Sequence, residues 1–214
     1  IAKQAPFCIL ENVDRLLKSP AKQRGRDFGV MLACFAELGY SVEWRVVNAA
    51  QYGAAQRRRR TFIFAYRDDT RYGKMAGKKA PESILKDAGF MAKAFPVDEI
   101  GKLSGVALQG DVINVSDTFL FAFENAGYMH KGHIYTAKVI EKEETAITLS
   151  QILQSNVGGK YYISNDKMPK WTYLKGAKKI PRKSPDGHEY VFSEGPIAFP
   201  DPWDRPGRTM LTSE

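Results

Sequence analysis

The sequence predicts an α/β fold over its first third, followed by a region of mixed, mostly β character. Three features carry this prediction: a short apolar run near the N-terminus, an amphipathic stretch at helical spacing, and two alternating stretches after it. Beyond Arg71 the composition changes, because glycine, lysine and proline there interrupt short strand-like runs. We therefore expect a domain boundary near residue 70.

The first region is predicted to contain a strand, a helix and two further strands. The apolar run at residues 7–10 is typical of a strand buried on both faces. Apolar residues at helical spacing predict a helix over residues 26–38, with Gly39 as its C-terminal cap. Alternation predicts strands at residues 42–46 and 62–66. A buried strand, a crossover helix and further strands indicate the edge of an α/β sheet.

The second region is predicted to consist of short strands joined by irregular loops. Strand-like runs cover residues 111–115, 133–136 and 160–163, and helices are expected at residues 81–90 and 149–153. This mixture is typical of a separate, mostly β domain.

The composition indicates a chain with a substantial core and an excess of positive charge. Hydrophobic residues make up 43% of the 214 residues, which excludes wholesale disorder. The formal net charge of +8 is compatible with a polyanionic partner, although many basic proteins bind no nucleic acid. No run approaches the ~18 apolar residues of a membrane span. Because Ile1 is not a natural start, we expect the chain to begin inside a longer protein.

Cysteine and histidine usage argues against a disulfide framework and against a metal site. Cys8 and Cys34 are the only cysteines, and both lie among apolar residues. His130 and His133 have no second pair of ligands near them in the sequence. We expect no bound metal and a protein of the reducing cytoplasm.

A carboxylate stands where the first predicted strand ends. Leu10 closes the apolar run, and Glu11, Asn12 and Val13 follow it. Ligands of open α/β sheets bind at the carboxyl ends of strands, so Glu11 occupies the place of a catalytic carboxylate. The alternative is a solvated acidic residue at the start of a loop, which is the commoner role of a single glutamate.

Four consecutive arginines, residues 57–60, lead into the strand predicted at 62–66. Neighbouring strand residues point to opposite faces, so Arg58 and Arg60 are expected to share one face with Gln56, and Arg57 and Arg59 the other. One face can then line a site while the other meets phosphates. The alternative is a solvated basic edge that prevents strand pairing.

Together, these two segments resemble hallmark motifs of the DNA cytosine-5 methyltransferases. The motifs are Glu-Asn-Val after an apolar strand, here residues 11–13, and Gln-x-Arg-x-Arg before a strand, here residues 56–60. They stand in the family's order and separation, and the match runs from residue 7 to residue 67. The segment 205–214 also looks like the motif that follows the family's recognition domain.

The resemblance implies a methyl transfer from S-adenosylmethionine to C5 of a cytosine flipped out of double-stranded DNA, in a restriction-modification setting. It casts Glu11 as the residue that hydrogen-bonds N3 and the exocyclic amine of the base, and Arg60 as the residue that holds its O2. Arg58 joins these two as a catalytic residue. Asn12 and Gln56 are expected to support the pocket.

The resemblance also implies a division of the chain. Residues 1–70 would form part of a methyltransferase-type doubly wound sheet, residues 71–204 a mixed, mostly β target-recognition domain, and residues 205–214 the start of a return to the core. The segment 170–183 interleaves cations with aromatic residues, as a DNA-facing loop does, although a solvated lysine-rich surface explains it equally well. The expected DNA contacts are Arg57, Arg59, Lys170, Trp171, Lys175, Lys178, Lys179 and Arg182.

Two features that the family requires are absent from the sequence: the glycine-rich turn that holds the cofactor, and the Pro-Cys dipeptide of the nucleophile. Cys8 does not replace that nucleophile, because it lies within the first strand, three residues before Glu11. We therefore expect a portion that is inactive alone, and an enzyme that is monomeric when complete. Two alternatives stay open: a non-catalytic DNA-recognition subunit of a two-chain methyltransferase, and a relative that methylates tRNA.

Overall fold

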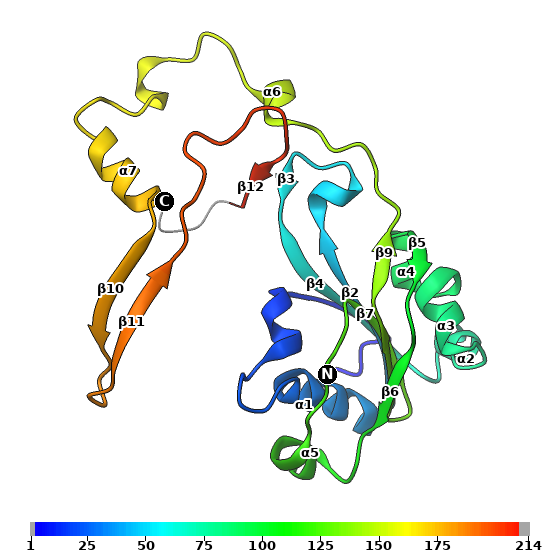
Figure 1. Ribbon diagram of the computed structural model, residues 1–214. Coiled ribbons are helices and arrows are strands. Elements are labelled where there is room, and N and C mark those ends of the chain that lie inside the picture. The colour runs from blue at the N-terminus through cyan, green and yellow to red at the C-terminus, as the bar shows by residue number, and fades with distance from the viewer. Residues whose placement is uncertain (1–2, 210–214) are drawn as a thin grey trace. The chain divides into compact units, whose positions relative to one another are not determined.

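The structure, a computed structural model, describes residues 3–209 (Figure 1). The chain divides into unit 1, Ile1–Ala146, and unit 2, Ile147–Glu214. The predicted functional boundary near residue 70 does not coincide with a break in packing, because strands from both sides of it share the sheet of unit 1.

The described residues of unit 1 form a six-stranded sheet in the order β1-β4-β2-β7-β8-β6. Its strands are β1 (Phe7–Asn12), β2 (Tyr40–Asn48), β4 (Arg59–Arg67), β6 (Ser104–Ala107), β7 (Ala126–His130) and β8 (His133–Ala137). All neighbouring pairs are antiparallel. The predicted α/β class is thus confirmed in part: helices and sheet are combined, but the described sheet is not the parallel, doubly wound one that was expected.

The crossover predicted from the sequence is nevertheless present. β1 and β2 each run antiparallel to β4, which lies between them, so β1 and β2 are parallel to each other. Helix α1 (Arg26–Glu37) connects them, as a crossover helix connects parallel strands. The later strand β4 inserts between the two, and this insertion makes the local pairing antiparallel.

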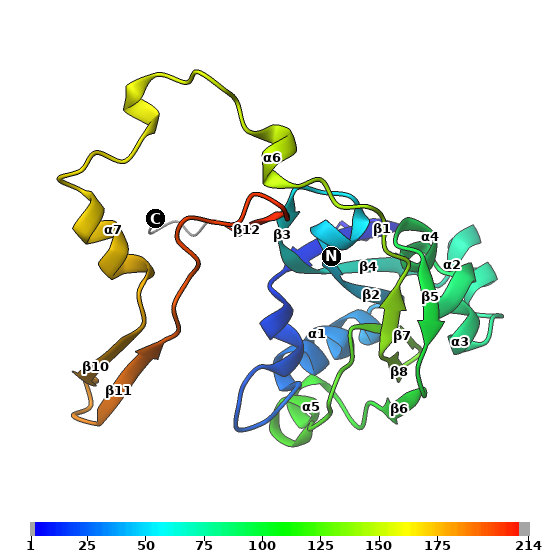
Figure 2. The same cartoon turned by 45° about the horizontal axis from the view of Figure 1, so that its top comes forward.

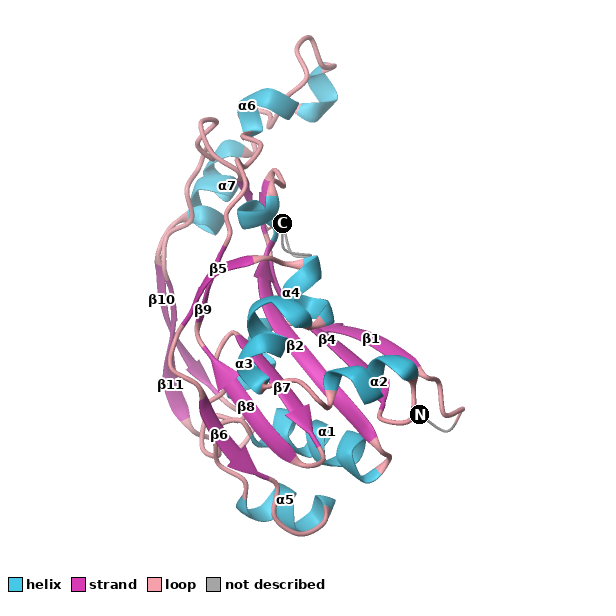
Figure 3. Cartoon of the chain, turned by 90° about the vertical axis from the view of Figure 1, so that its right-hand side faces the viewer, coloured by secondary structure: helices cyan, strands magenta, loops and turns pink. Residues whose placement is uncertain are grey.

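Helices cover both faces of the sheet (Figures 2 and 3). On one face, α1 and α5 (Val112–Thr118) pack on a core that includes Trp44 and Ile63. On the other face, a second core includes Phe64 and Tyr66. It is covered by α2 (Arg71–Ala76), α3 (Pro81–Ser83), the π-helix η3 (Ile84–Ala88) and α4 (Phe90–Ala94). The remaining elements of unit 1 are η1 (Asp14–Lys18), η2 (Ala49–Tyr52), β3 (Gln56–Arg57) and the antiparallel pair β5 (Val97–Ile100) and β9 (Val139–Glu141).

Two buried charges in β2 fix the helices of the second face. The Glu43 carboxylate accepts hydrogen bonds from the Met91 backbone N–H (3.0 Å) and the Tyr72 hydroxyl (2.8 Å). The Arg45 guanidinium donates to the carbonyls of Leu85 (2.9 Å) and Phe95 (3.0 Å). Burial raises the pKa of Glu43. These bonds pair the Glu43 carboxylate and both terminal nitrogens of Arg45, and they set where the helices lie against the sheet.

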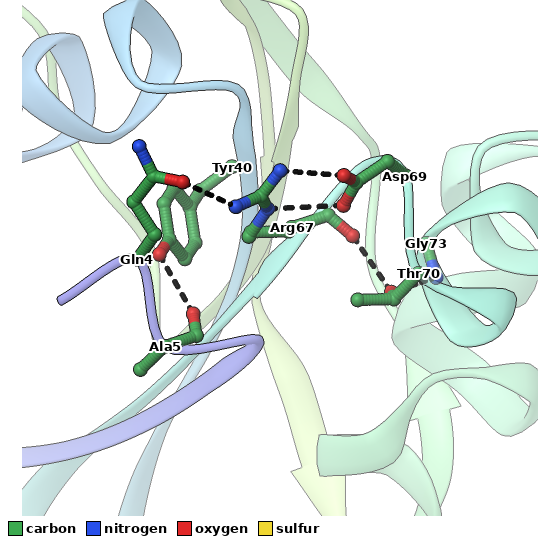
Figure 4. Close-up of polar contacts among 7 residues, drawn as sticks. All are labelled: Gln4, Ala5, Tyr40, Arg67, Asp69, Thr70 and Gly73. Atoms are coloured by element: carbon green, nitrogen blue, oxygen red, sulfur yellow. Dashed lines mark hydrogen bonds and ion pairs between the residues drawn. The ribbon is translucent and has the colours of Figure 1, made fainter.

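A polar cluster at the far end of β4 leads into α2 (Figure 4). Arg67 donates to Asp69 (3.0 Å) and to Gln4 (3.0 Å). The Thr70 hydroxyl donates to the Arg67 carbonyl (2.7 Å) and accepts from the Gly73 N–H (3.0 Å), which caps the helix. The strand and the helix are therefore joined by a hydrogen-bonded turn.

Unit 2 contains little regular structure. Its elements are α6 (Leu149–Ile152), η4 (Gly159–Tyr161), α7 (Met168–Lys175), β10 (Lys178–Lys183), β11 (Glu189–Glu194) and β12 (Gly207–Arg208). β10 and β11 form an antiparallel hairpin. Residues 210–214, the end of the third family-like segment, lie outside the described residues.

Several sequence predictions are confirmed and three are wrong. The helix at 26–38, the strands at 42–46, 62–66 and 133–136, and the short helix at 149–153 are present, and the helix expected at 81–90 occurs as α3, η3 and α4.

The first error concerns β1, which was expected to be buried on both faces. It is instead an exposed edge strand, with Phe7 47% and Ile9 62% exposed. Within the run, Cys8 packs on the core and Phe7 stacks on one side against Phe64, but much of the apolar surface of the strand stays uncovered by the described residues.

The other two errors are errors of element type. Residues 111–115 begin helix α5, because Asp111 caps it by accepting from the Asn114 N–H (2.9 Å) and because Val112, Val115 and Phe119 face the core at helical spacing. Residues 160 and 161 belong to the 3-10 helix η4, and residues 162–163 follow it at an exposed surface, where no described strand pairs with them.

We expect Gly127→Ala to destabilise unit 1. Gly127 pairs with Trp44 across β2 and β7, and a Cβ at this position would overlap the indole ring, which is only 1% exposed. Overpacking of this kind costs about 1–3 kcal/mol in the free energy of unfolding. Urea unfolding followed by circular dichroism measures the loss. The control is Gly159→Ala, because nothing lies within 4 Å of a Cβ there; equal stability of the two variants would contradict the packing.

Candidate active site and nucleic-acid surface

Glu11 and Arg60 form an ion pair at one end of the sheet. The β1–β4 register places Glu11 opposite Phe62, so Arg60, two residues earlier in β4, lies diagonally across on the same face. The Arg60 Nε lies 2.6 Å from the Glu11 Oε1. The structure thus brings together the two residues that the sequence marked separately as a catalytic carboxylate and a pocket arginine.

The pair is oriented but remains open to solvent. Arg60 also donates from Nη1 to the Arg59 carbonyl (2.7 Å), which fixes the plane of its guanidinium. The Arg60 side chain is 21% exposed and the Glu11 side chain 47%. Within residues 3–209, neither side chain makes a further hydrogen bond. An acceptor oxygen of Glu11 and donor N–H groups of Arg60 therefore lie side by side. They could bind a planar group that has a hydrogen-bond donor and an acceptor on one edge.

The arginine run divides at the start of β4. Arg59 points to the opposite face from Arg60, and its Nε lies 3.6 Å from the Asp14 Oδ2. Arg58 lies between β3 and β4, where its N–H donates to the Gln56 carbonyl (3.0 Å). The strand is interrupted there, so the expected sharing of one face by Arg58, Arg60 and Gln56 does not follow from alternation. The exposed Arg57 lies in β3.

Asn12 is the last residue of β1, and Gln56 lies in β3, three residues before β4 begins. The Asn12 Oδ1 accepts a hydrogen bond from the Val13 N–H (2.8 Å), which orders the chain as it leaves β1. Gln56 is half-buried in β3. A support role for both stays a prediction.

The predicted DNA contacts of unit 2 fall into two groups. Lys170, Lys179 and Arg182 are exposed, and the Arg182 guanidinium stacks over Phe192, 4.1 Å from the ring centroid. Lys175 is only 5% exposed and its ammonium lies 5.2 Å from the centre of the Trp171 ring.

Lys178 also faces inward. It donates to the Leu174 carbonyl (2.7 Å) and pairs with Glu194 (2.8 Å). The expectation of one cationic surface therefore suits Lys170, Lys179 and Arg182 better than Lys175 and Lys178. Lys175 lies against Trp171 of its own helix, and Lys178 joins α7 to the hairpin.

Neither cysteine contributes to the Glu11–Arg60 end. Cys8 lies in β1 three residues before Glu11, so its side chain points to the opposite face, where it packs on the core that Trp44 belongs to. Both Cys8 and Cys34 are free and half-buried. Among residues 3–209, no three His, Cys, Asp or Glu side chains gather as metal ligands, and no helix is long and apolar enough to cross a membrane.

Sequence reasoning missed a cavity next to Arg59. Lys18, Arg24 and Lys138 reach its rim from three separate segments of unit 1. No local pattern joins these residues, because only the folded sheet brings the segments together.

The two segments that meet at the Glu11–Arg60 pair both lie inside the match to a known protein family. The chain belongs to the C-5 cytosine-specific DNA methylase family, whose model matches residues 2–206.

Individual relatives agree with this family. The type II methyltransferase M.Sau3AI of Staphylococcus aureus is 48% identical over 211 residues, which covers 97% of this chain and 51% of that protein. M.MthTI of Methanothermobacter thermautotrophicus is 31% identical over 112 residues, covering 50% of the chain and 32% of that protein. M.NlaIV of Neisseria lactamica is 39% identical over 66 residues, covering 29% and 16%. The chain thus spans about half the length of the Staphylococcus relative, and less of the other two.

We expect Glu11→Gln to leave the stability of the chain almost unchanged. The ion pair with Arg60 is partly solvated, and such pairs contribute about 0–1 kcal/mol to the free energy of unfolding. Thermal and urea unfolding of the variant measure the difference. A loss well above this range would mean that the pair serves mainly to hold the sheet together.

Proposed function

We propose that the chain is the DNA-recognising portion of a DNA (cytosine-5-)-methyltransferase, together with part of its base pocket. The complete enzyme would transfer a methyl group from S-adenosylmethionine to C5 of a cytosine flipped out of a specific duplex sequence. The observation that carries the proposal is the Glu11–Arg60 pair at one end of the sheet, formed by two segments inside the family match.

The geometry of the pair suits the edge of a cytosine. The base presents its exocyclic amine, N3 and O2 in one row. The free oxygen of Glu11 would accept from the amine, and a protonated Glu11 would donate to N3. Arg60 would donate to O2, where negative charge grows as a nucleophile adds to C6. Its bond to the Arg59 carbonyl orients the guanidinium before the base arrives.

The methyl donor and the nucleophile are assigned to the other half of the enzyme. S-adenosylmethionine supplies an electrophilic methyl group when bound, and it carries a cationic sulfonium. The cavity beside Arg59 does not suit it, because lysine and arginine side chains form the rim. Residues of this chain therefore receive no cofactor-binding role, and a cysteine outside it would attack the base.

The exposed edge of β1 marks where that other half would join. β1 is the outermost strand of the sheet, and Phe7 and Ile9 on it are 47% and 62% exposed. Covering these side chains and pairing the open edge would complete the sheet next to Glu11. This chain covers 51% of the Staphylococcus relative, so the remainder of that relative is about as long as this chain.

The finer assignments follow from the same proposal. Residues 1–70 would serve the catalytic core, residues 71–204 target recognition, and residues 205–214 the return to the core. Arg58 would act beside Glu11 and Arg60, with Asn12 and Gln56 in support. Arg57, Arg59, Lys170, Trp171, Lys179 and Arg182 would contact DNA. We expect the complete enzyme to be monomeric, cytoplasmic and part of a restriction-modification system.

Methyl transfer into duplex DNA tests the proposal. We expect the chain alone to transfer no labelled methyl group, and the enzyme completed by its other half to do so. If the protein is a two-chain methyltransferase, its two halves need not be joined in one chain. A further experiment therefore mixes the separately purified halves. Transfer by the chain alone, or none by the complete enzyme on a pool of random duplexes, would overturn it.

In the complete enzyme, Glu11→Gln should slow single-turnover methylation by about 10²-fold or more, as expected for a positioned acid-base group. DNA affinity should change little, because the variant keeps the size and polarity of the side chain. Near-normal turnover by Glu11→Gln would remove Glu11 from the catalytic residues.

Substitutions on the two faces of β4 should affect different quantities, the methylation rate on one face and the DNA affinity on the other. Arg60→Ala should lower the single-turnover rate and leave the salt dependence of DNA binding nearly unchanged. Arg59→Ala should mainly weaken binding and reduce the salt slope by roughly one unit. The two variants serve as controls for each other, since they remove the same side chain from neighbouring positions. Matching profiles would contradict the assignment of opposite faces to opposite tasks.

A further inference from the structure

A cavity of about 250 Å³ opens in unit 1 on the face of the sheet opposite to Glu11 and Arg60. Its inner wall is apolar and rigid: Leu17, Val46 and Phe123 are 3%, 5% and 4% exposed. Such a wall offers van der Waals contact to a carbon ring at the bottom of the cavity.

The rim of the cavity is cationic. Lys18, Arg24, Arg59 and Lys138 lie around it and are exposed. Arg59 is 3.6 Å from Asp14, a long and solvated contact that neutralises it only in part. The other three cations form no ion pair within the described residues. Glu124 is the second carboxylate on the rim, so positive charge stays in excess.

The backbone beneath three of these cations is held in place. The Arg24 carbonyl accepts from the Phe121 N–H (3.0 Å), and the Lys138 carbonyl accepts from the Gly101 N–H (2.7 Å). Arg59 lies in the β4 ladder opposite Asn48 of β2. The fold thus sets the backbone positions of these three residues, so no backbone entropy is lost there when their side chains bind an anion.

We propose that this cavity binds one phosphodiester of the DNA, with the phosphate among the rim cations and its deoxyribose on the apolar wall. The inference rests on the proposed function and adds Lys18, Arg24 and Lys138 to the residues that hold the substrate. Arg59 and Arg60 are neighbours in β4 on opposite faces, so the bound linkage would lie close to the flipped cytosine. The contact would fix the register of the duplex without reading its sequence.

Neutral backbone linkages test the cavity in the complete enzyme. Single methylphosphonate substitutions are placed at each of about four linkages on either side of the target cytosine, since adjacent phosphates of a strand are spaced ~3.4 Å along the axis. A methylphosphonate at the linkage that the cavity holds should weaken binding by the wild-type enzyme. The variant with Lys18→Gln, Arg24→Gln and Lys138→Gln should bind the normal duplex more weakly, with a salt slope smaller by about 0.9 per lost phosphate contact. A methylphosphonate at that one linkage should cause no further loss of DNA affinity in this triple variant.

The control is Lys102→Gln, which removes one charge from an exposed position of unit 1 outside the cavity. It should keep the full effect of every methylphosphonate. If the triple variant instead loses as much affinity as the wild type at each methylphosphonate position, the cavity holds no DNA phosphate and the inference is wrong. An inactive wild-type enzyme would contradict the proposed function itself. Circular dichroism and urea unfolding, both expected to be unchanged, show that the triple variant is folded.

Discussion

The antiparallel pairing of β4 with both β1 and β2 is the constraint on which the rest of unit 1 depends. It sets Glu11 opposite Phe62 and therefore diagonal to Arg60, so the ion pair follows from the register. A shift of one residue would turn Arg60 to the other face and put Arg59 beside Glu11. The same pairing buries β2 on both sides and lets its charged residues anchor the helices of one face.

The alternation of side chains along β4 also explains why neighbouring arginines of one run lie on two different surfaces. Arg60 joins Glu11 on one face, whereas Arg59 reaches the cavity rim on the other. The side chains of neighbouring strand residues point to opposite faces and cannot reach the same small group, but they can hold two parts of one extended ligand. A nucleic acid is such a ligand, since its bases and its phosphates lie at different distances from its axis.

The sequence predicted the local elements of unit 1 well and its topology less well. Helix α1 and strand β2 were predictable because their side chains repeat with the period of the element. The insertion of β4 between β1 and β2 was not, because pairing partners depend on contacts between distant segments. Asp111 shows a different failure: its capping side chain marked the start of α5, but the short apolar run after it was interpreted as a strand.

For the candidate site, motif residues were predictable and their neighbours were not. Glu11 and Arg60 belong to local patterns, whereas Lys18, Arg24 and Lys138 come from three segments that share no pattern. Lys175 shows the reverse case. Its position in a basic stretch predicted a surface contact, but it lies against Trp171 inside unit 2.

The open edge of β1 has an evolutionary consequence. A joint made by strand pairing relies on backbone N–H and C=O groups, which every residue except proline provides in full. Under the proposed function, the two halves can diverge in sequence along this joint and still recognise each other. The outward apolar side chains, Phe7 and Ile9, need partners of matching shape, so substitutions there would have to be accompanied by changes in the other half. Exchange of halves between relatives would then be limited by these side chains, and far less by the strand that carries them.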